Sequence, residues 1–408
     1  MRYGLRILTA MVLNLVVATA GAAEPRIVEK LAAHRPVKIV CVGDSVTGVY
    51  YHTGGRRAYP EMLQLALKQA WPGAEATVVN AGISGNTTVD ALKRLDRDVL
   101  SHAPDLVTVM FALNDMVRVP LADFEANLVE IIRRCRAAGA EVLLCTPNSV
   151  IDTPHRPVSR LVEYCDGTKR VAERQQASVC DVYAAYEALR TRDPLAWRLL
   201  LSDEIHPNMD GHKLTAQTIC RSTIDREVSL ASTGPPLPAM PKLQVLVAEG
   251  KPLRVLAMPP YDKLIKPALE AVIPATKVEV RSWPTADQSL AQLEQAAKQV
   301  RSAPPDLVLV AVPLSVTPDV QSPPEEAIRA YRWVLNWSLS FGLQQWDVVG
   351  IAPSVLRADL TPEEKRRDDF ARRMIRAQDL SLIARQDNDT SPSEQILQSW
   401  LRDQLGGK

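Results

Sequence analysis

The chain lacks an excess of either charge, with 48 Lys and Arg against 47 Asp and Glu among its 408 residues. With 46% hydrophobic residues, this balance excludes intrinsic disorder, which requires low hydrophobicity and high net charge. It also argues against nucleic acid as a partner, because polyanion binding leaves a basic excess. At roughly 100–200 residues per domain, the length predicts a globular protein of two domains.

An apolar run of the roughly 20 residues needed to span a membrane is also missing. The mostly apolar segment at residues 7–18 is too short, follows Arg2 and Arg6, and gives way to small residues at 20–23. This pattern predicts a secretory signal peptide over residues 1–23. The mature chain is therefore expected to be exported, periplasmic or extracellular, and without a stable membrane span.

The six cysteines lack the spacing of zinc ligands and do not suggest a disulfide framework. Three of them lie in or beside short apolar runs, where a free cysteine behaves as a small hydrophobic residue: Cys41, Cys145 and Cys180. In an exported protein, one disulfide between two of the other three cysteines is an alternative: Cys135, Cys165 and Cys220.

What is present throughout is an alternation of short apolar runs with longer stretches of helical periodicity, typical of a parallel sheet covered by helices. In the first half we expect strands at 37–42, 76–80, 106–111, 141–146 and 178–182. Helices are expected between them at 59–70, 89–100, 121–138 and 158–177, with a last helix after His212. The pattern predicts a doubly wound α/β domain over residues 36–230.

A proline-rich segment at 232–241 interrupts this pattern, because so many prolines fit neither a helix nor a central strand. We interpret residues 231–251 as an interdomain linker. Strands are expected again at 253–258, 277–282, 307–312, 348–352 and 380–384, so residues 252–408 form a second α/β domain.

The second half echoes the first, most clearly in the sequence Pro-Asp-Leu-Val at 104–107 and at 305–308. A diverged duplication, with the second domain as a degenerate copy, would explain the match. Strand motifs that unrelated α/β domains share would explain it equally well.

The first expected strand ends in Gly43-Asp44-Ser45, at the carboxyl edge where open α/β sheets bind ligands. Glycine permits a tight turn, and a helix starting after Ser45 would direct backbone N–H groups at developing negative charge. Ser45 could therefore act as a nucleophile. Taken alone, the tripeptide is better explained by an ordinary turn in which Ser45 caps a helix.

Two further loops reach the same edge. The loop at 80–88 contains Gly85, whose N–H could lie beside Ser45, and the third strand ends close to Asn114, whose side-chain amide could donate to an oxyanion. The alternative there is a turn in which Thr87 or Thr88 caps the next helix, which explains the threonines but not Gly85. Asx-turn bonding to nearby backbone is the simpler explanation for Asn114 and is expected of Asp115 in any case.

Asp203 precedes His206 by three residues in an expected loop, so its carboxylate can reach Nδ1–H of the ring while Nε2 faces a nucleophile. A metal site that adds Asp210 and His212 is an alternative, although a helical ligand pair with a general-base Glu is missing. We expect His212 at the start of the last helix. The remaining histidines lack such neighbours and are expected at the surface: His34, His52, His102 and His155.

In combination, these four elements resemble the four motifs of the GDSL, or SGNH, hydrolase superfamily, in the family's order and over about residues 36–230. The resemblance implies Ser45 as the nucleophile, with Asp203 and His206 completing the triad. It also implies an oxyanion hole made by the N–H groups of Ser45 and Gly85 and the side chain of Asn114. One position departs from the family pattern: Ala112 replaces the glycine usual two places before the asparagine, and its methyl group should narrow the edge.

The resemblance implies an ester hydrolase in which His206 takes the Ser45 proton and water later releases the acid from an acyl-enzyme, without a metal or cofactor. The second half cannot repeat this chemistry, because all six histidines lie at or before position 212 and Pro259-Pro260-Tyr261 stands in place of Gly-Asp-Ser. We expect it to support the first domain, with its large aromatics in core packing: Tyr331, Trp333, Trp337 and Trp346.

The leading hypothesis is an exported carboxylic-ester hydrolase that removes a small acyl group, such as acetyl from a carbohydrate. A lysophospholipase or thioesterase acting on longer, lipid-like acyl chains is the next alternative, and acyl transfer to a glycan uses the same intermediate. A non-catalytic binding or scaffold protein is the alternative from another class. The oligomeric state stays open.

Overall fold

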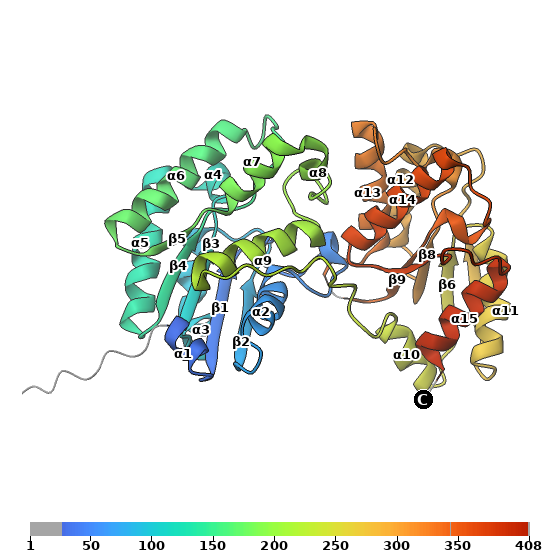
Figure 1. Ribbon diagram of the computed structural model, residues 1–408, viewed down its shortest axis with the longest axis horizontal. Coiled ribbons are helices and arrows are strands. Elements are labelled where there is room, and N and C mark those ends of the chain that lie inside the picture. The colour runs from blue at the N-terminus through green and yellow to red at the C-terminus, as the bar shows by residue number, and fades with distance from the viewer. Residues whose placement is uncertain (1–26, 343, 407–408) are drawn as a thin grey trace, which may run out of the picture.

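The computed structural model describes residues 27–342 and 344–406, over which the chain forms two five-stranded parallel sheets in neighbouring domains (Figure 1). Both domains are α/β, as expected. The expected signal peptide at 1–23 lies outside the described residues. Within them, no helix has the length and apolar character needed to cross a membrane.

The first sheet has the strand order β2-β1-β3-β4-β5, the order of a doubly wound fold. Its central strands are almost continuously apolar because helices cover both faces of the sheet. The strands are β1 (Val37–Gly43), β2 (Ala76–Gly82), β3 (Leu106–Met110), β4 (Glu141–Cys145) and β5 (Ser178–Cys180). The last ends two residues earlier than expected, because the Asp181 carboxylate accepts a hydrogen bond from Ala184 N–H and so begins a helix.

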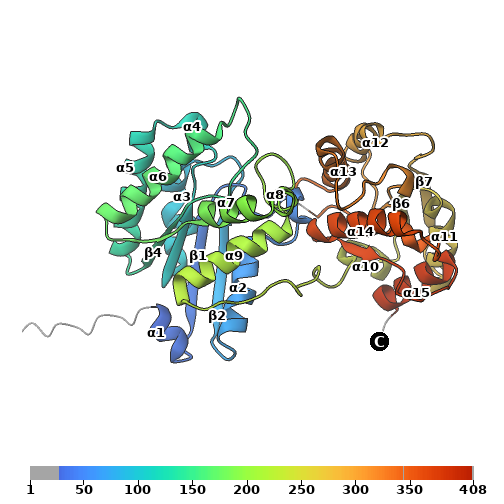
Figure 2. The same ribbon diagram turned by 45° about the horizontal axis from the view of Figure 1, so that its top comes forward.

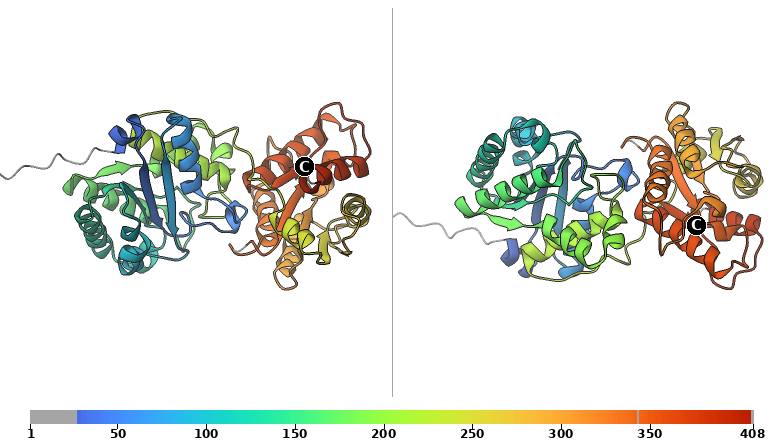
Figure 3. Two further views of the ribbon diagram at one scale, coloured as in Figure 1. Left: turned by 90° about the horizontal axis from the view of Figure 1, so that it is seen from below. Right: turned by 90° about the horizontal axis from the view of Figure 1, so that it is seen from above.

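Helices lie on both sides of this sheet (Figure 3). One packed pair is α2 with α9, and another group consists of α3, α5 and α6. The helical elements of the domain are α1 (Ile27–Ala32), η1 (Tyr51–Thr53), α2 (Tyr59–Ala70), α3 (Thr88–Asp98), η2 (Leu100–His102), α4 (Asp115–Arg118), α5 (Leu121–Ala137), α6 (Val158–Arg174), α7 (Val182–Arg192), α8 (Pro194–Arg198) and α9 (Met209–Ile224).

The second sheet has the order β7-β6-β8-β9-β10, which repeats the order of the first. Its strands are β6 (Leu253–Ala257), β7 (Val278–Ser282), β8 (Leu307–Val310), β9 (Asp347–Ile351) and β10 (Ser381–Ile383). Its helical elements are α10 (Pro241–Ala248), α11 (Tyr261–Val272), α12 (Leu290–Ala297), η3 (Lys298–Val300), η4 (Leu314–Val316), α13 (Glu325–Ser338), η5 (Pro353–Val355), α14 (Pro362–Ala377) and α15 (Ser393–Leu405). Because this order is common among doubly wound folds, duplication and a shared architecture both stay open.

The interpretation of residues 231–251 as a linker is wrong for its second half, which forms α10. Pro241 occupies the first turn of this helix, where the missing N–H of a proline leaves no hydrogen bond unmade. The buried side chains of Leu243 and Leu246 then join the core of the second domain. The connecting segment proper therefore ends at Met240.

The two domains meet along a junction of polar and aromatic contacts, where α9 and α14 come together (Figure 2). Arg57 of the first domain donates to both carboxylate oxygens of Asp379 in the second, at 2.9 and 2.6 Å. Trp333 also faces the junction and packs its ring against Tyr51, with the centroids 6.0 Å apart, so the expected core packing is wrong for this residue. Direct contact thus joins the second domain to the loop that follows β1.

All six cysteines lie in the described part of the chain, where each is buried and free. Cys41, Cys145 and Cys180 pack within the first core, as expected of small hydrophobic residues. The disulfide left open among the other three is not formed in this structure.

Candidate active site

Ser45 lies in a tight turn at the carboxyl end of β1. The Asp44 carbonyl closes the turn by accepting a hydrogen bond from Thr47 N–H at 3.2 Å. Gly43 is required at its entry, because a Cβ there would lie 2.0 Å from Thr47 Oγ1 and 2.7 Å from the Met110 carbonyl oxygen. Close packing of the backbone therefore fixes where Ser45 stands.

The expectation of a helix directly after Ser45 is wrong. The turn continues instead into the short 3-10 element η1, and α2 begins only at Tyr59. The intervening loop carries η1 to the junction of the two domains, so its side chains border the site.

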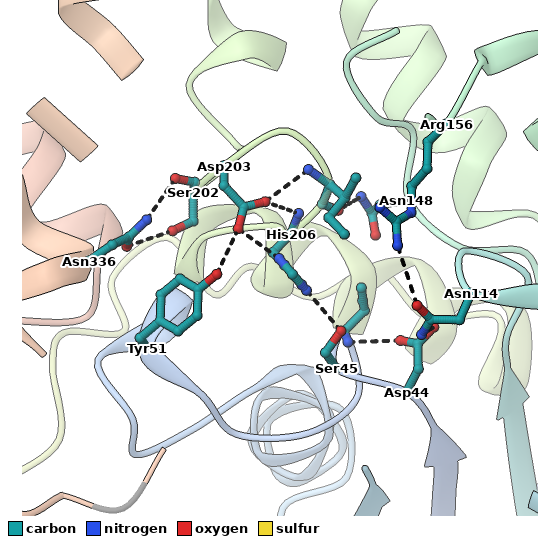
Figure 4. Close-up of polar contacts among 12 residues, drawn as sticks. Asp44, Ser45, Tyr51, Asn114, Asn148, Arg156, Ser202, Asp203, His206 and Asn336 are labelled. Carbon is teal, nitrogen blue, oxygen red and sulfur yellow. Dashed lines mark hydrogen bonds and ion pairs between the residues drawn. The ribbon is translucent and has the colours of Figure 1, made fainter. Parts of the chain in front are cut away.

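Ser45, His206 and Asp203 form a continuous series of hydrogen bonds (Figure 4). Ser45 Oγ lies 2.8 Å from His206 Nε2, and His206 Nδ1 lies 2.7 Å from Asp203 Oδ2. A carboxylate beside Nδ1 keeps the proton on that nitrogen, which leaves Nε2 free to accept the serine proton. The structure thus brings together the three residues that the sequence singled out.

The loop that carries Asp203 and His206 is folded back on itself. Ser202 N–H donates to the His206 carbonyl at 2.8 Å. Asp203 Oδ1 accepts hydrogen bonds from the N–H groups of Ile205 at 2.9 Å and His206 at 2.8 Å. The folded loop thus lets the Asp203 carboxylate reach the ring of a histidine three residues later.

Burial and charge oppose each other in this pair. Burial alone would raise the pKa of Asp203, but the His206 ring and two backbone N–H groups hold that pKa well below its usual range. Burial alone would lower the pKa of His206. The Asp203 carboxylate outweighs burial and raises the pKa of His206 above the ordinary value for histidine. The arrangement stabilises a protonated imidazole, as a general base requires.

His52 is buried, so the expectation that it lies at the surface is wrong. Its side chain is 1% exposed, and its ring stacks between His206 and His212 at centroid distances of 4.6 and 5.7 Å. Burial, together with these two imidazoles, lowers the pKa of His52 well below its usual value. A neutral ring therefore lies flat against His206 and limits its rotation.

His212 lies in the first turn of α9, as expected. It is fully buried, and its Nδ1 accepts a hydrogen bond from Tyr59 N–H at 2.9 Å. Of the other histidines expected at the surface, His34 and His155 are exposed and His102 is half-buried. The alternative metal set is not assembled, because no group of three His, Cys, Asp or Glu side chains in the described residues is placed to hold an ion.

Asn114 follows β3 and reaches the turn that holds Ser45. Its amide donates to Asp44 Oδ2 at 3.3 Å and to the Asn86 carbonyl at 3.1 Å. Arg156, which the sequence did not reveal, donates to Asn114 Oδ1 at 3.5 Å and so orients the amide (Figure 4). Burial raises the pKa of Asp44 to about 6.

Gly85 lies one residue before Asn86, so its loop passes beside Asn114. Its φ of 75° falls in the left-handed region that favours glycine. Ala112 has a φ of 113°, which gives a physical reason for the glycine usual at this place. Asp115, expected to bond nearby backbone, accepts chiefly from the N–H and hydroxyl of Thr88 at the start of α3.

Known proteins resemble the chain over the part that holds this site. The model of the GDSL-like lipase/acylhydrolase family matches residues 41–214. An acetylxylan esterase of Geobacillus stearothermophilus is 30% identical over 210 residues, which cover 45% of this chain and 92% of that protein. An arylesterase of Vibrio mimicus is 26% identical over 195 residues, covering 47% of this chain and 91% of that protein.

Solved structures are similar as well. The crystal structure of an acetylxylan esterase from Geobacillus stearothermophilus shares 28% sequence identity and has a TM-score of 0.40, covering 46% of this chain and 94% of that one.

Proposed function

Because the chain belongs to the GDSL-like lipase/acylhydrolase family, we propose that it is an exported serine ester hydrolase that removes small acyl groups, acetyl from a carbohydrate in particular. The observation that carries the proposal is the hydrogen-bonded series from Ser45 through His206 to Asp203, at 2.8 and 2.7 Å. The acetylxylan esterase among the relatives supports the choice of substrate.

In the proposed reaction, His206 Nε2 takes the proton of Ser45 while Ser45 Oγ attacks the ester carbonyl. Asp203 holds the ring in the required tautomer and stabilises the imidazolium. His206 then gives its proton to the departing alcohol, which leaves an acyl group on Ser45. Water, activated by the same ring, releases the acid and restores the hydroxyl.

The oxyanion is assigned to the N–H groups of Ser45 and Gly85 and to the Asn114 amide. Both amide hydrogens of Asn114 are engaged, and the bond to Asp44, at 3.3 Å, is the longer of the two. We expect the oxyanion to replace Asp44 as the acceptor of that hydrogen. Removing one such donor typically costs about 10²–10³ in rate.

The test is hydrolysis of p-nitrophenyl acetate, butyrate and octanoate, and of acetylated xylo-oligosaccharides, by the purified protein and by Ser45→Ala. We expect the acetate to be cleaved fastest and Ser45→Ala to lose about 10⁴ or more in kcat. Ser101→Ala, at an exposed position on the first domain, serves as the matched control.

A preference for octanoate would reassign the substrate to longer acyl chains. Acyl transfer would appear as acylated acceptor sugar in place of free acid. Absence of esterase activity, together with no labelling of Ser45 by a fluorophosphonate, would leave a binding role.

Export is tested separately, by fractionating cells that express the full chain or a chain without residues 2–23. The proposal expects the full chain outside the cytoplasm, with a shortened N-terminus, and the truncated chain inside. Equal distribution of the two chains would contradict it.

A further inference from the structure

We propose that Tyr51 is a positioning residue for the Asp203–His206 pair and that the second domain holds Tyr51 and the Asp203 loop in their working geometry. The inference rests on the proposed function, since it assigns Asp203 the task of orienting His206. It gives the second domain a defined part in the active centre of the first.

Tyr51 donates a hydrogen bond from its hydroxyl to Asp203 Oδ2 at 3.1 Å, on the same oxygen that faces His206 Nδ1 (Figure 4). The two Asp203 oxygens thus accept four donors, two on each oxygen. A carboxylate satisfied on every side cannot rotate away from the ring without losing a charge-assisted hydrogen bond. The Tyr51 hydroxyl also draws part of the negative charge of the Asp203 carboxylate toward itself, so His206 experiences less of that charge.

Tyr51 is itself held by side chains of the second domain. Its ring packs against Trp333 and Phe341, at centroid distances of 6.0 and 5.5 Å. The Arg301 guanidinium lies over the ring, 5.4 Å from its centroid. Gln378 Nε2 donates to the Tyr51 backbone carbonyl at 2.7 Å. Four second-domain groups therefore fix both the ring and the backbone of one first-domain residue.

A second contact holds the loop beside Asp203. Ser202 is fully buried, and its hydroxyl donates to Asn336 Oδ1 at 3.0 Å, while Asn336 Nδ2 donates to the Ser202 carbonyl at 3.1 Å. Gln378 Nε2 reaches the same Asn336 oxygen at 2.6 Å. Because all three side chains are buried, losing one partner would leave the others unsatisfied.

The neighbouring Tyr50 extends the contact to the loop of Gly85. Its hydroxyl accepts a hydrogen bond from Ser84 N–H at 2.8 Å, and its ring lies 5.8 Å from that of Phe341. The consecutive residues Tyr50, Tyr51 and His52 thus touch the Gly85 loop, Asp203 and His206 in turn. The second domain contacts the first two of these residues directly.

The proposal is tested by the pKa of His206, measured by NMR titration of its ring and assigned with His206→Ala. Several charged or titratable groups act on this ring or on the Tyr51–Asp203 pair: Asp44, Arg156, Asp203, His52, His212, Arg301 and Glu204. The variants below leave all seven in place, so a shift in the His206 pKa reports on the hydrogen bonds and the geometry of the Asp203–His206 pair.

Tyr51→Phe keeps the ring packing and removes the hydroxyl. With one donor fewer, the Asp203 charge is concentrated on His206, so we expect the His206 pKa to rise by about 0.5–1 unit. The acid limb of kcat/KM on p-nitrophenyl acetate should move upward with it, and kcat should fall about 10-fold with KM nearly constant. Tyr183→Phe, at a half-buried tyrosine of α7, is the matched control.

Asn336→Leu removes the second-domain support of the Asp203 loop. The loosened pair stabilises the imidazolium less, so the His206 pKa should fall, in the direction opposite to Tyr51→Phe. Gln395→Leu, at an exposed amide of α15, is the control. Should Asn336→Leu not fold, Phe341→Ala replaces it, because Phe341 is 55% exposed and its loss leaves no cavity in either core. Phe341 packs on the Tyr51 ring, so its loss loosens the Tyr51–Asp203 hydrogen bond, and the His206 pKa should then rise as in Tyr51→Phe.

Unchanged His206 pKa values in both Tyr51→Phe and the second-domain variant would overturn the proposal, whatever the enzyme activity. Shifts in the expected directions would support it even if no ester is hydrolysed, since the titration needs no substrate. Failure of the proposed function shows instead as an inactive wild type that does not label at Ser45, so the two failures are distinguishable.

Discussion

The carboxyl edges of the two sheets differ far more than the sheets themselves. In the first domain, the loops after β1 and β3 present the polar groups of Asp44, Ser45 and Asn114. In the second, the loops after β6, β8 and β9 border a cavity of about 500 Å³. Prolines stand within three residues of each strand end: Pro259, Pro260, Pro313 and Pro353. Apolar side chains lie beside them: Val312, Leu314 and Ile351.

This difference shows that one strand order can support opposite kinds of edge. A proline has no N–H to offer a developing oxyanion, and no histidine lies in the second domain to act as a base. The second edge lacks these reactive groups, although its sheet has the same strand order as the first. The residues that come after the strands therefore determine what each domain can do, and the shared fold only brings those residues to one edge of the sheet.

An aspartate just before the third strand of each sheet shows what the two domains do share. Asp105 Oδ2 accepts a hydrogen bond from Lys38 N–H at 2.7 Å, and Asp306 Oδ2 accepts one from Arg254 N–H at 2.8 Å. Each aspartate thus ties the entry of a third strand to the first strand of its own sheet. The repeated Pro-Asp-Leu-Val sequence therefore has the same structural task twice.

The largest expected contrast between the domains is in acid stability. Burial lowers the pKa of His52 well below its usual value and that of His212 to about 3. Because these folded-state values lie below the unfolded value of about 6.5, the unfolded chain binds protons first. Stability that is fully present above pH 6.5 is then lost on acidification, by about 1.4 kcal/mol per pH unit for each histidine.

Asp44 changes the stability of the first domain in the opposite direction and offsets the effect of one of these histidines. Burial raises the pKa of Asp44 to about 6, so protonation below that pH removes a buried charge from the folded state. We expect the first domain to lose stability on balance between pH 6 and pH 4, because the losses from the two histidines exceed the gain from Asp44. The second domain contains Asp347, whose pKa burial also raises to about 6, and should gain stability over the same range. Peptide-resolved hydrogen exchange, corrected for its intrinsic pH dependence, measures both. Parallel losses in the two domains would contradict this account.

An intermediate effect tests the shared aspartates. Asp105→Ala and Asp306→Ala each leave a strand N–H without its charged acceptor, which should cost about 2 kcal/mol in the domain concerned. Urea unfolding of each variant, followed by domain-resolved hydrogen exchange, gives the two free energies. Asp369→Ala, at an exposed position on α14, is the control and should change neither. Very unequal losses of unfolding free energy in the two domains would show that Asp105 and Asp306 do not have the same structural task.

The smallest effect concerns one alanine in each domain. Ala112 has a φ of 113°, so glycine at this position relieves backbone strain of about 1 kcal/mol. This gain offsets two usual costs of replacing alanine by glycine, which are the lost contacts of the methyl group and the greater conformational entropy of the unfolded chain. We expect Ala112→Gly to remain within about 0.5 kcal/mol of the wild type. Ala311→Gly, after the matching strand β8, lacks that relief and should lose about 1.5 kcal/mol. Equal losses of stability in Ala112→Gly and Ala311→Gly, measured by thermal unfolding, would contradict the claim that the backbone at Ala112 is strained.

Much of this architecture could be predicted from the sequence, because buried parallel strands are short apolar runs bounded by turn residues. Strands such as β1 and β9 were expected to within one residue of their ends. Ser45 was singled out by its place after a strand, and Asp203 with His206 by their spacing. The resemblance to the GDSL superfamily then joined the three as a triad. The linker was misjudged because the first-turn proline of α10 resembles the prolines that precede it.

The contacts around the site could not be predicted in the same way. His52 stands between Tyr51 and Thr53 with no polar pattern. Its burial arises only when the Asp203–His206 loop and the first turn of α9 bring His206 and His212 to either side of it. Asn336 reaches Ser202 from 134 positions further along the chain. A signal was present in the aromatic run just after Ser45, but nothing in that run tells which partners it meets.

The run Tyr50-Tyr51-His52 also constrains how this protein can evolve. Loops near active sites usually tolerate insertions and deletions, because their backbone is exposed and makes few fixed contacts. Here three adjacent side chains serve three different partners, so one residue gained or lost between Ser45 and His52 would exchange all three contacts at once. Relatives that carry a comparable second domain should therefore keep the length of this segment constant, even where its composition drifts.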